Sequence, residues 1–136
     1  MTDLPVFVLD SSALLAYLTD EPLAARIENL LENARQQTCR LLLSIINLGE
    51  ILYITERRGG VERAQDTLAL LRQLPIEILP AEEPLVLSAA HIKANNAISF
   101  ADAFVAAVAQ REGATILTGD QEFQTVEELV SIEWLV

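Results

Sequence analysis

The chain has 136 residues, of which 51% are hydrophobic; this composition excludes a disordered protein, and the length suffices for a core without disulfides. Its 20 acidic and 9 basic side chains give a formal net charge of −11, whereas nucleic-acid-binding surfaces normally depend on clustered basic residues. No apolar run reaches the roughly 18 residues of a membrane span, and no basic segment precedes the first apolar stretch as in a signal peptide. The length therefore predicts one domain over residues 1–136, and the hydropathy predicts no membrane association. The single cysteine, Cys39, cannot form an internal disulfide, so we expect the protein in the reducing cytoplasm.

The predicted elements alternate between strands and helices along the whole chain. In chain order they are a strand over 6–9, helices over 11–18 and 22–35, a strand over 41–43, helices over 45–58 and 61–74, a strand over 76–79, helices over 84–95 and 100–112, and strands over 115–118 and 132–135. This alternation predicts an α/β fold. We expect a three-layer α/β/α sandwich with a mainly parallel sheet of four to five strands and right-handed crossovers.

Four carboxylates each lie where an apolar run meets a helix start or a turn. They are Asp10 in VFVLDSS, Glu50 in LLLSIINLGE, Asp102 in AISFADAF and Asp120 in ATILTGD. Parallel sheets bind ligands beyond the carboxyl ends of their strands, which is the edge where we expect these groups. Two carboxylates about 4 Å apart repel by roughly 4 kcal/mol at an effective dielectric near 20, so a cluster needs a counter-ion or a raised pKa. Oxygen ligands without a His or Cys motif favour Mg²⁺ or Mn²⁺ over zinc.

Three of the four carboxylates also have a purely structural explanation. Asp10 is a suitable N-cap for the helix that follows it. Asp102 and Ser99 match a capping box, in which the carboxylate returns a hydrogen bond to the cap residue. Asp120 follows a Thr-Gly pair and is a typical turn residue. Taken singly, these three positions do not require a function.

Glu50 is harder to explain by structure alone. Together with Ser44 and Asn47 it forms a narrow polar stripe, three residues apart, on a predicted helix whose N-terminal half is otherwise apolar. A solvated helix would carry charges on a wide face rather than one carboxylate on a narrow strip. Glu50 is therefore predicted to be functional.

The chain resembles the PIN-domain family, and more closely the toxin ribonucleases of bacterial VapBC-type toxin–antitoxin pairs. The resemblance is carried by LDSSALLAYL, SIINLGEIL, ISFADAFVAAVA and ILTGDQEF, in that order, and covers essentially the whole chain. It places the four acidic positions of the family on Asp10, Glu50, Asp102 and Asp120, and the supporting polar positions on Ser12, Asn47 and Thr118.

The resemblance implies a Mg²⁺-dependent endoribonuclease that cleaves RNA with a metal-activated water, Mn²⁺ being the expected substitute ion. In this scheme Asp10, Asp102 and Asp120 hold the metal and Glu50 orients or deprotonates the water, which leaves 5′-phosphate and 3′-OH ends. It further implies a homodimer and a small antitoxin whose C-terminal tail blocks the acidic site. For RNA binding by so acidic a chain, the candidate groove residues are Arg57, Arg58 and Arg63.

Two other enzyme classes that place an Asp after the first strand fit less well. Aspartate phosphatases need a second Asp where this chain has Ser12, and a lysine near the site, whereas Lys93 is the only lysine. Receiver-type phosphoacceptor domains need an additional acidic pair and a late lysine. Two alternatives stay open: a non-catalytic PIN-like interaction module, in which the acids are caps and turns, and an RNA-processing nuclease that is not a toxin.

Overall fold

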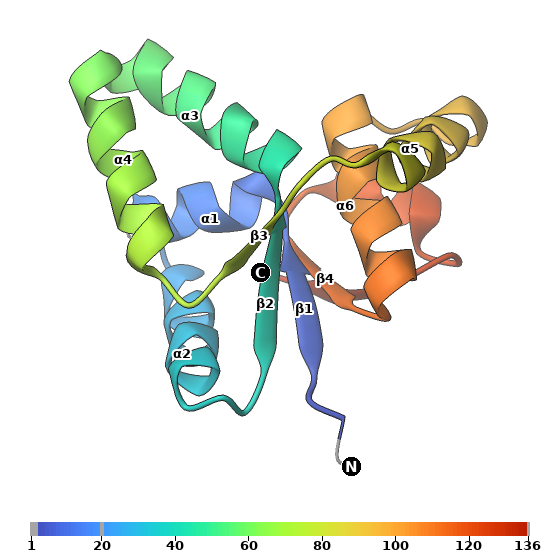
Figure 1. Ribbon diagram of the computed structural model, residues 1–136, viewed down its shortest axis with the longest axis horizontal. Helices are drawn as coiled ribbons and strands as arrows, with labels where there is room; N and C mark the ends of the chain where they lie inside the picture. Colours follow the sequence, from blue (N-terminus) through green and yellow to red (C-terminus); the bar gives the residue numbers. More distant parts are fainter. Residues whose placement is uncertain (1–2, 20, 136) are drawn as a thin grey trace.

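The structure, a computed structural model, describes residues 3–19 and 21–135. The strands in this part of the chain form one five-stranded sheet (Figure 1). In chain order they are β1 (Val6–Leu9), β2 (Arg40–Ser44), β3 (Glu77–Leu79), β4 (Thr115–Thr118) and β5 (Ser131–Trp134). They lie in the order β3-β2-β1-β4-β5, and every neighbouring pair is parallel. The carboxyl ends of all five strands therefore lie at the same edge.

The helices within the described residues cover both faces of the sheet (Figure 1). One face carries α1 (Ser11–Leu18), α2 (Ala24–Arg35), α3 (Ile45–Gly59) and α4 (Val61–Gln73), and the other carries α5 (Glu83–Asn95) and α6 (Phe100–Glu112). The predicted three-layer α/β/α sandwich is confirmed, with a sheet that is parallel throughout. None of these helices combines the length and the apolar character needed to cross a membrane.

The central strands are apolar on both sides because each side faces a layer of helices. In β2, Leu41 and Leu43 belong to the core under α1–α4, whereas Leu42 belongs to the core under α5 and α6. Val8 and Leu9 of β1 are divided between the two cores in the same way. Continuous apolar runs, rather than alternating ones, are the pattern of strands buried on both faces.

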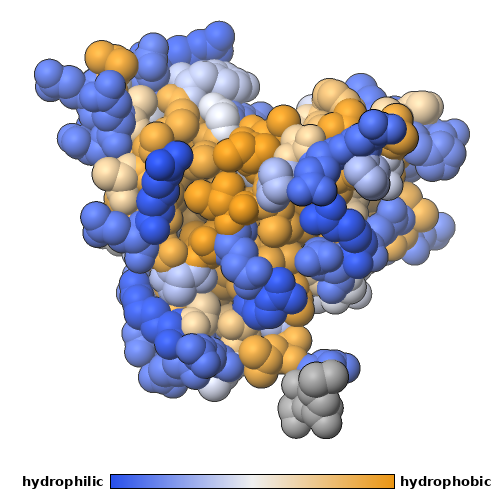
Figure 2. Space-filling view, viewed as in Figure 1, coloured by the Kyte–Doolittle hydropathy of each residue, from blue (hydrophilic) through white to orange (hydrophobic). Residues whose placement is uncertain are grey.

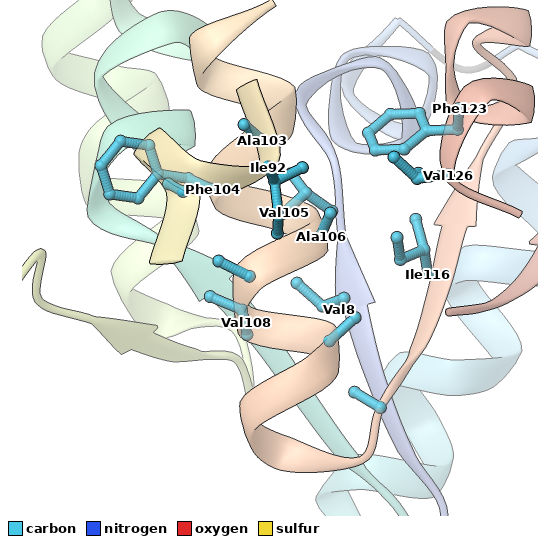
Figure 3. Close-up of a cluster of buried hydrophobic side chains, with 14 of the residues drawn as sticks. Val8, Ile92, Ala103, Phe104, Val105, Ala106, Val108, Ile116, Phe123 and Val126 are labelled. Atoms are coloured by element: carbon cyan, nitrogen blue, oxygen red, sulfur yellow. The ribbon is translucent and has the colours of Figure 1, made fainter. Parts of the chain in front are cut away.

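Helix α6 is buried on all sides from Asp102 to Ala109. Every residue from Ala103 to Ala109 is buried, and the small alanines let the helix lie close to the sheet. Figure 3 shows α6 beside Val8 and Ile116 of the sheet, with Phe123 packed near its N-terminal end. Because α6 is fixed in this way, its first turn holds Asp102 at the carboxyl edge of the sheet.

The structure departs from the predicted element boundaries by one or two residues and contains one element that was not predicted. Helix α2 begins at Ala24 rather than at 22, and β3 begins at Glu77 rather than at 76. The additional element is a 3-10 helix, η1 (Gln121–Val126), after β4. Its two buried apolar side chains, Phe123 and Val126, are too few to give a periodic signal.

Candidate active site

Asp10 lies directly after β1 and is the most buried of the four carboxylates, with 1% of its surface exposed. It caps α1 by accepting a hydrogen bond from the Ala13 amide at 2.8 Å. The Ser12 hydroxyl lies 2.8 and 2.9 Å from its two oxygens, and the Thr118 hydroxyl donates to Oδ2. Burial raises the pKa of Asp10, the three donors oppose this, and the charge of Asp120 adds to the increase. Asp10 therefore caps α1 as predicted, but the capping bond uses only its Oδ1 atom.

Asp102 is also buried, but its carboxylate is not used as a cap. The Ser99 hydroxyl accepts from the Asp102 amide at 3.2 Å, as a capping box requires. The reciprocal bond is absent, because the Ser99 amide donates to the Glu122 carboxylate instead. Burial and the charges of Asp10, Glu122 and Asp120 raise the pKa of Asp102 to about 8. The predicted capping box is therefore only half formed. Ser99 caps the helix, but the Asp102 carboxylate does not accept from the Ser99 amide.

Asp120 and Glu122 approach the same place from the segment after β4. Asp120 caps η1 by accepting from the Glu122 amide at 2.9 Å, and its own amide donates to the Thr118 hydroxyl at 2.9 Å. Carboxylate oxygens of Asp102, Asp120 and Glu122 all lie within 4.8 Å of one another. Glu122 was not predicted from the sequence. The signal for it is the second acid of TGDQEF, two residues after Asp120.

Glu50 lies outside this group of three carboxylates and is held by a different set of contacts. It is half-buried in the second turn of α3, a helix capped by Ser44, and accepts a hydrogen bond from the Ser11 hydroxyl. Asn47, one turn earlier, is fully buried and donates to the Ser11 hydroxyl at 3.4 Å and to the carbonyl of Ala101 at 3.3 Å. The Asn47 Oδ1 atom has no hydrogen-bond partner.

Three of the four predicted acids, Asp10, Asp102 and Asp120, thus lie in one group, and Glu50 lies outside it. The charge of Asp120 contributes to the raised pKa of both Asp10 and Asp102, the charge of Asp10 contributes to that of Asp102, and Glu122 lies beside Asp102 and Asp120. Within the described residues, the ion pairs join other side chains, such as Arg26 with Glu133 and Arg40 with Glu77. A set of buried and half-buried oxygen donors that no cation of the described residues neutralises fits a hard divalent ion.

The three arginines predicted to bind RNA lie on the α3–α4 hairpin. The Arg57 guanidinium lies 5.0 Å from the centre of the Tyr53 ring. Arg58 and Arg63 line a hollow of about 700 Å³ between α1 and the hairpin, together with Glu62 and Asp66. None of the four predicted acids lines this hollow, and its charge is mixed rather than basic.

The comparison with protein families identifies the class of this protein. A model of the PIN domain matches residues 7–129, so the chain belongs to the PIN domain family. None of the curated proteins compared with the chain matches it.

Solved structures share the fold over nearly the whole chain. VapBC2 from Rickettsia felis, bound to a DNA fragment from its promoter, is 18% identical, with 96% of this chain and 99% of that chain covered and a TM-score of 0.77. DNA-bound VapBC from Salmonella typhimurium is 21% identical, with 98% of this chain and 100% of that chain covered and a TM-score of 0.75. The sarcin-ricin loop cleaving toxin VapC20 from Mycobacterium tuberculosis is 20% identical, with 87% of this chain and 92% of that chain covered and a TM-score of 0.67.

Proposed function

We propose that this PIN domain is a Mg²⁺-dependent endoribonuclease and the toxin of a toxin–antitoxin pair. The observation that supports this most is the group of two buried and two half-buried carboxylates at the carboxyl edge of the sheet, which no cation in the described part of the chain neutralises. Caps and turns alone do not explain it, because the Asp102 carboxylate makes no capping bond to Ser99. A group of acids that helix capping explains only in part, and that lies beside no cation of the described residues, is the expected form of a site that binds a metal ion.

Asp10, Asp102 and Asp120 would hold the ion, with Glu122 as a further oxygen donor in reach of the last two. When bound, a divalent ion supplies positive charge against the scissile phosphate and lowers the pKa of water. The chain itself orients Asp10 through Ser12, Thr118 and the first turn of α1. Glu50, held beside the group rather than in it, would orient the attacking water or take its proton.

The proposed partners follow from the comparisons and from the surface. Toxin–antitoxin complexes are among the solved structures that share the fold, and we propose that a small antitoxin covers the acidic edge with a basic side chain. VapC20 is named as a toxin that cleaves the sarcin-ricin loop, and we take this as support for RNA as the substrate of this protein. We propose that RNA contacts Arg57, Arg58 and Arg63, and that the protein acts in the cytoplasm.

We further propose that the protein is a homodimer. Figure 2 shows an apolar area between the α3–α4 side and the α5–α6 side of the molecule. Ile45 and Ile46 at the start of α3 and Phe100 at the start of α6 are large apolar side chains, each at least 36% exposed. A second copy would remove such a surface from water, which favours association.

Incubation of the purified protein with a mixed RNA pool, with Mg²⁺ or with EDTA, tests the proposal. We expect cleavage only with the metal, and mapped products with 5′-phosphate and 3′-OH ends. Products with 2′,3′-cyclic phosphate ends would contradict a water nucleophile. A protein that binds Mg²⁺ or RNA but cleaves nothing would favour a non-catalytic interaction module. Cleavage by a protein whose gene has no small antitoxin gene beside it would favour an RNA-processing nuclease.

A further inference from the structure

The Ser11 hydroxyl is the only donor that contacts the Glu50 carboxylate among the described residues. Glu50 is not a member of the carboxylate group, and it forms no ion pair in the described part of the chain. A glutamate side chain has three rotatable bonds, so a half-buried carboxylate with a single donor depends on that donor for its orientation. Ser11 follows Asp10 in the chain and begins α1, so its backbone is fixed by the sheet edge itself.

Asn47 determines where the Ser11 hydroxyl points. A serine hydroxyl has one proton, and two acceptors lie in its reach: the Glu50 carboxylate and, farther away at 3.4 Å, the carbonyl oxygen of Asn47. The charged and nearer Glu50 oxygen takes the proton, so the remaining capacity of the Ser11 oxygen is that of an acceptor. The Asn47 amide donates into that oxygen at 3.4 Å and also to the carbonyl of Ala101 at 3.3 Å. The bonds therefore run in one direction, from the Asn47 amide through the Ser11 hydroxyl to the Glu50 carboxylate.

This short chain of hydrogen bonds joins the three helices that carry the site. Ser11 belongs to α1 beside Asp10, Asn47 belongs to α3 with Glu50, and Ala101 belongs to α6 beside Asp102. Ser11 and Asn47 are 5% and 0% exposed, so water does not compete for their bonds. A buried polar link at this point fixes the place of Glu50 relative to the carboxylate group.

We propose that Ser11 is a positioning residue for Glu50, with Asn47 setting the direction of its hydroxyl. The inference rests on the proposed function, in which Glu50 acts on the attacking water. It assigns distinct roles to the two adjacent serines: Ser12 orients Asp10, and Ser11 orients Glu50. A shift of about 1 Å in a positioned catalytic group costs on the order of 100-fold in rate, so the link should be visible in turnover.

Replacing Ser11 by Ala tests this, with Ser11→Thr as the variant that keeps a hydroxyl and Ser88→Ala on the exposed face of α5 as the control. At a temperature where all variants are folded, we expect Ser11→Ala to lower kcat by about 10- to 100-fold, the range found for partners that orient a functional group. KM for RNA and the dissociation constant for Mn²⁺ should stay near the wild-type values. Ser11→Thr should recover most of the lost kcat, and Ser88→Ala should change nothing.

A second measurement does not depend on activity or on the fit of the threonine methyl group. The carboxyl carbon of Glu50, observed by NMR in metal-free labelled protein and assigned with Glu50→Gln, should shift in Ser11→Ala and not in Ser88→Ala. An unchanged Glu50 signal, or an unchanged kcat in Ser11→Ala, would overturn the inference. If the wild type cleaves no RNA, the proposed function fails, and the NMR comparison still decides whether Ser11 holds Glu50.

Discussion

The two buried aspartates at the carboxyl edge of the sheet have different surroundings. Three donors orient Asp10, whereas charges of like sign surround Asp102. With a pKa of about 8, the metal-free Asp102 carries a proton at neutral pH. A cation that binds there must displace this proton, so metal affinity should rise with pH through that value.

The raised pKa of Asp102 predicts how the metal-free protein responds to pH. The folded value of about 8 lies above the ordinary 3.8, so the native state binds the proton more tightly than the unfolded chain. This contribution to stability is complete below about pH 4 and is lost as the pH rises through 8. In EDTA, we expect the melting temperature of the wild type to fall more steeply between about pH 5.5 and 8.5 than that of Asp102→Asn.

Thermal unfolding at a series of pH values measures both slopes in the same buffers. The difference between the two proteins reports the titration of Asp102 together with its effect on the acids coupled to it, Asp10, Asp120 and Glu122. Parallel curves would show that the carboxyl group is not held in its protonated form.

Asp10→Asn should separate stability from metal binding. The amide oxygen of Asn still accepts from the Ala13 amide, and the repulsion with Asp120 disappears. We expect a metal-free melting temperature equal to or above that of the wild type, while the increase caused by Mn²⁺ becomes much smaller. Calorimetry with and without Mn²⁺ makes the comparison. A full Mn²⁺ effect in the variant would exclude Asp10 from the metal site.

The strands and long helices could be predicted from the sequence, and the residues that complete the site could not. Continuous apolar runs marked β1 and β4, and the Ala-rich segment after Ser99 marked α6. Glu122 escaped prediction because η1 is a short 3-10 helix whose position depends on tertiary packing. The bond from the Ser99 amide to Glu122 joins residues 23 positions apart, and no local pattern contains it.

Helix η1 places two acids at the site, and Phe123 anchors it. Phe123 is fully buried against the core of α5 and α6. Phe123→Ala should lower the free energy of unfolding by about 3–5 kcal/mol. It should also weaken Mn²⁺ binding, because Asp120 and Glu122 lie just before this residue in the same segment. Denaturant titration and Mn²⁺ titration measure the two effects.

The matched control is Ile27→Ala on α2, which empties a fully buried position on the other face of the sheet. It should destabilise the protein by about 2–5 kcal/mol and leave the Mn²⁺ affinity of the folded protein unchanged. Equal weakening of Mn²⁺ binding in both variants would show that affinity follows global stability rather than the position of η1.

At the scale of the whole molecule, a net charge of −11 must be reconciled with RNA binding. We expect the double change of Arg57 and Arg58 to Ala to weaken binding of single-stranded RNA in EDTA and to reduce the salt slope by roughly 0.7 for each lost phosphate contact. Arg72→Ala, an exposed cation on α4, is the control. Unchanged affinity in the double variant would place the RNA elsewhere.

The carboxylates from separate segments are proposed to form one metal-dependent nuclease site. The most direct test measures RNA cleavage as a function of Mg²⁺ concentration for the wild type and for the Asp10→Asn variant. Cleavage by the wild type should rise with Mg²⁺, vanish in EDTA and return when Mg²⁺ or Mn²⁺ is restored, while Asp10→Asn stays inactive throughout. Cleavage that persists in EDTA, or a wild-type rate in Asp10→Asn, would contradict the account.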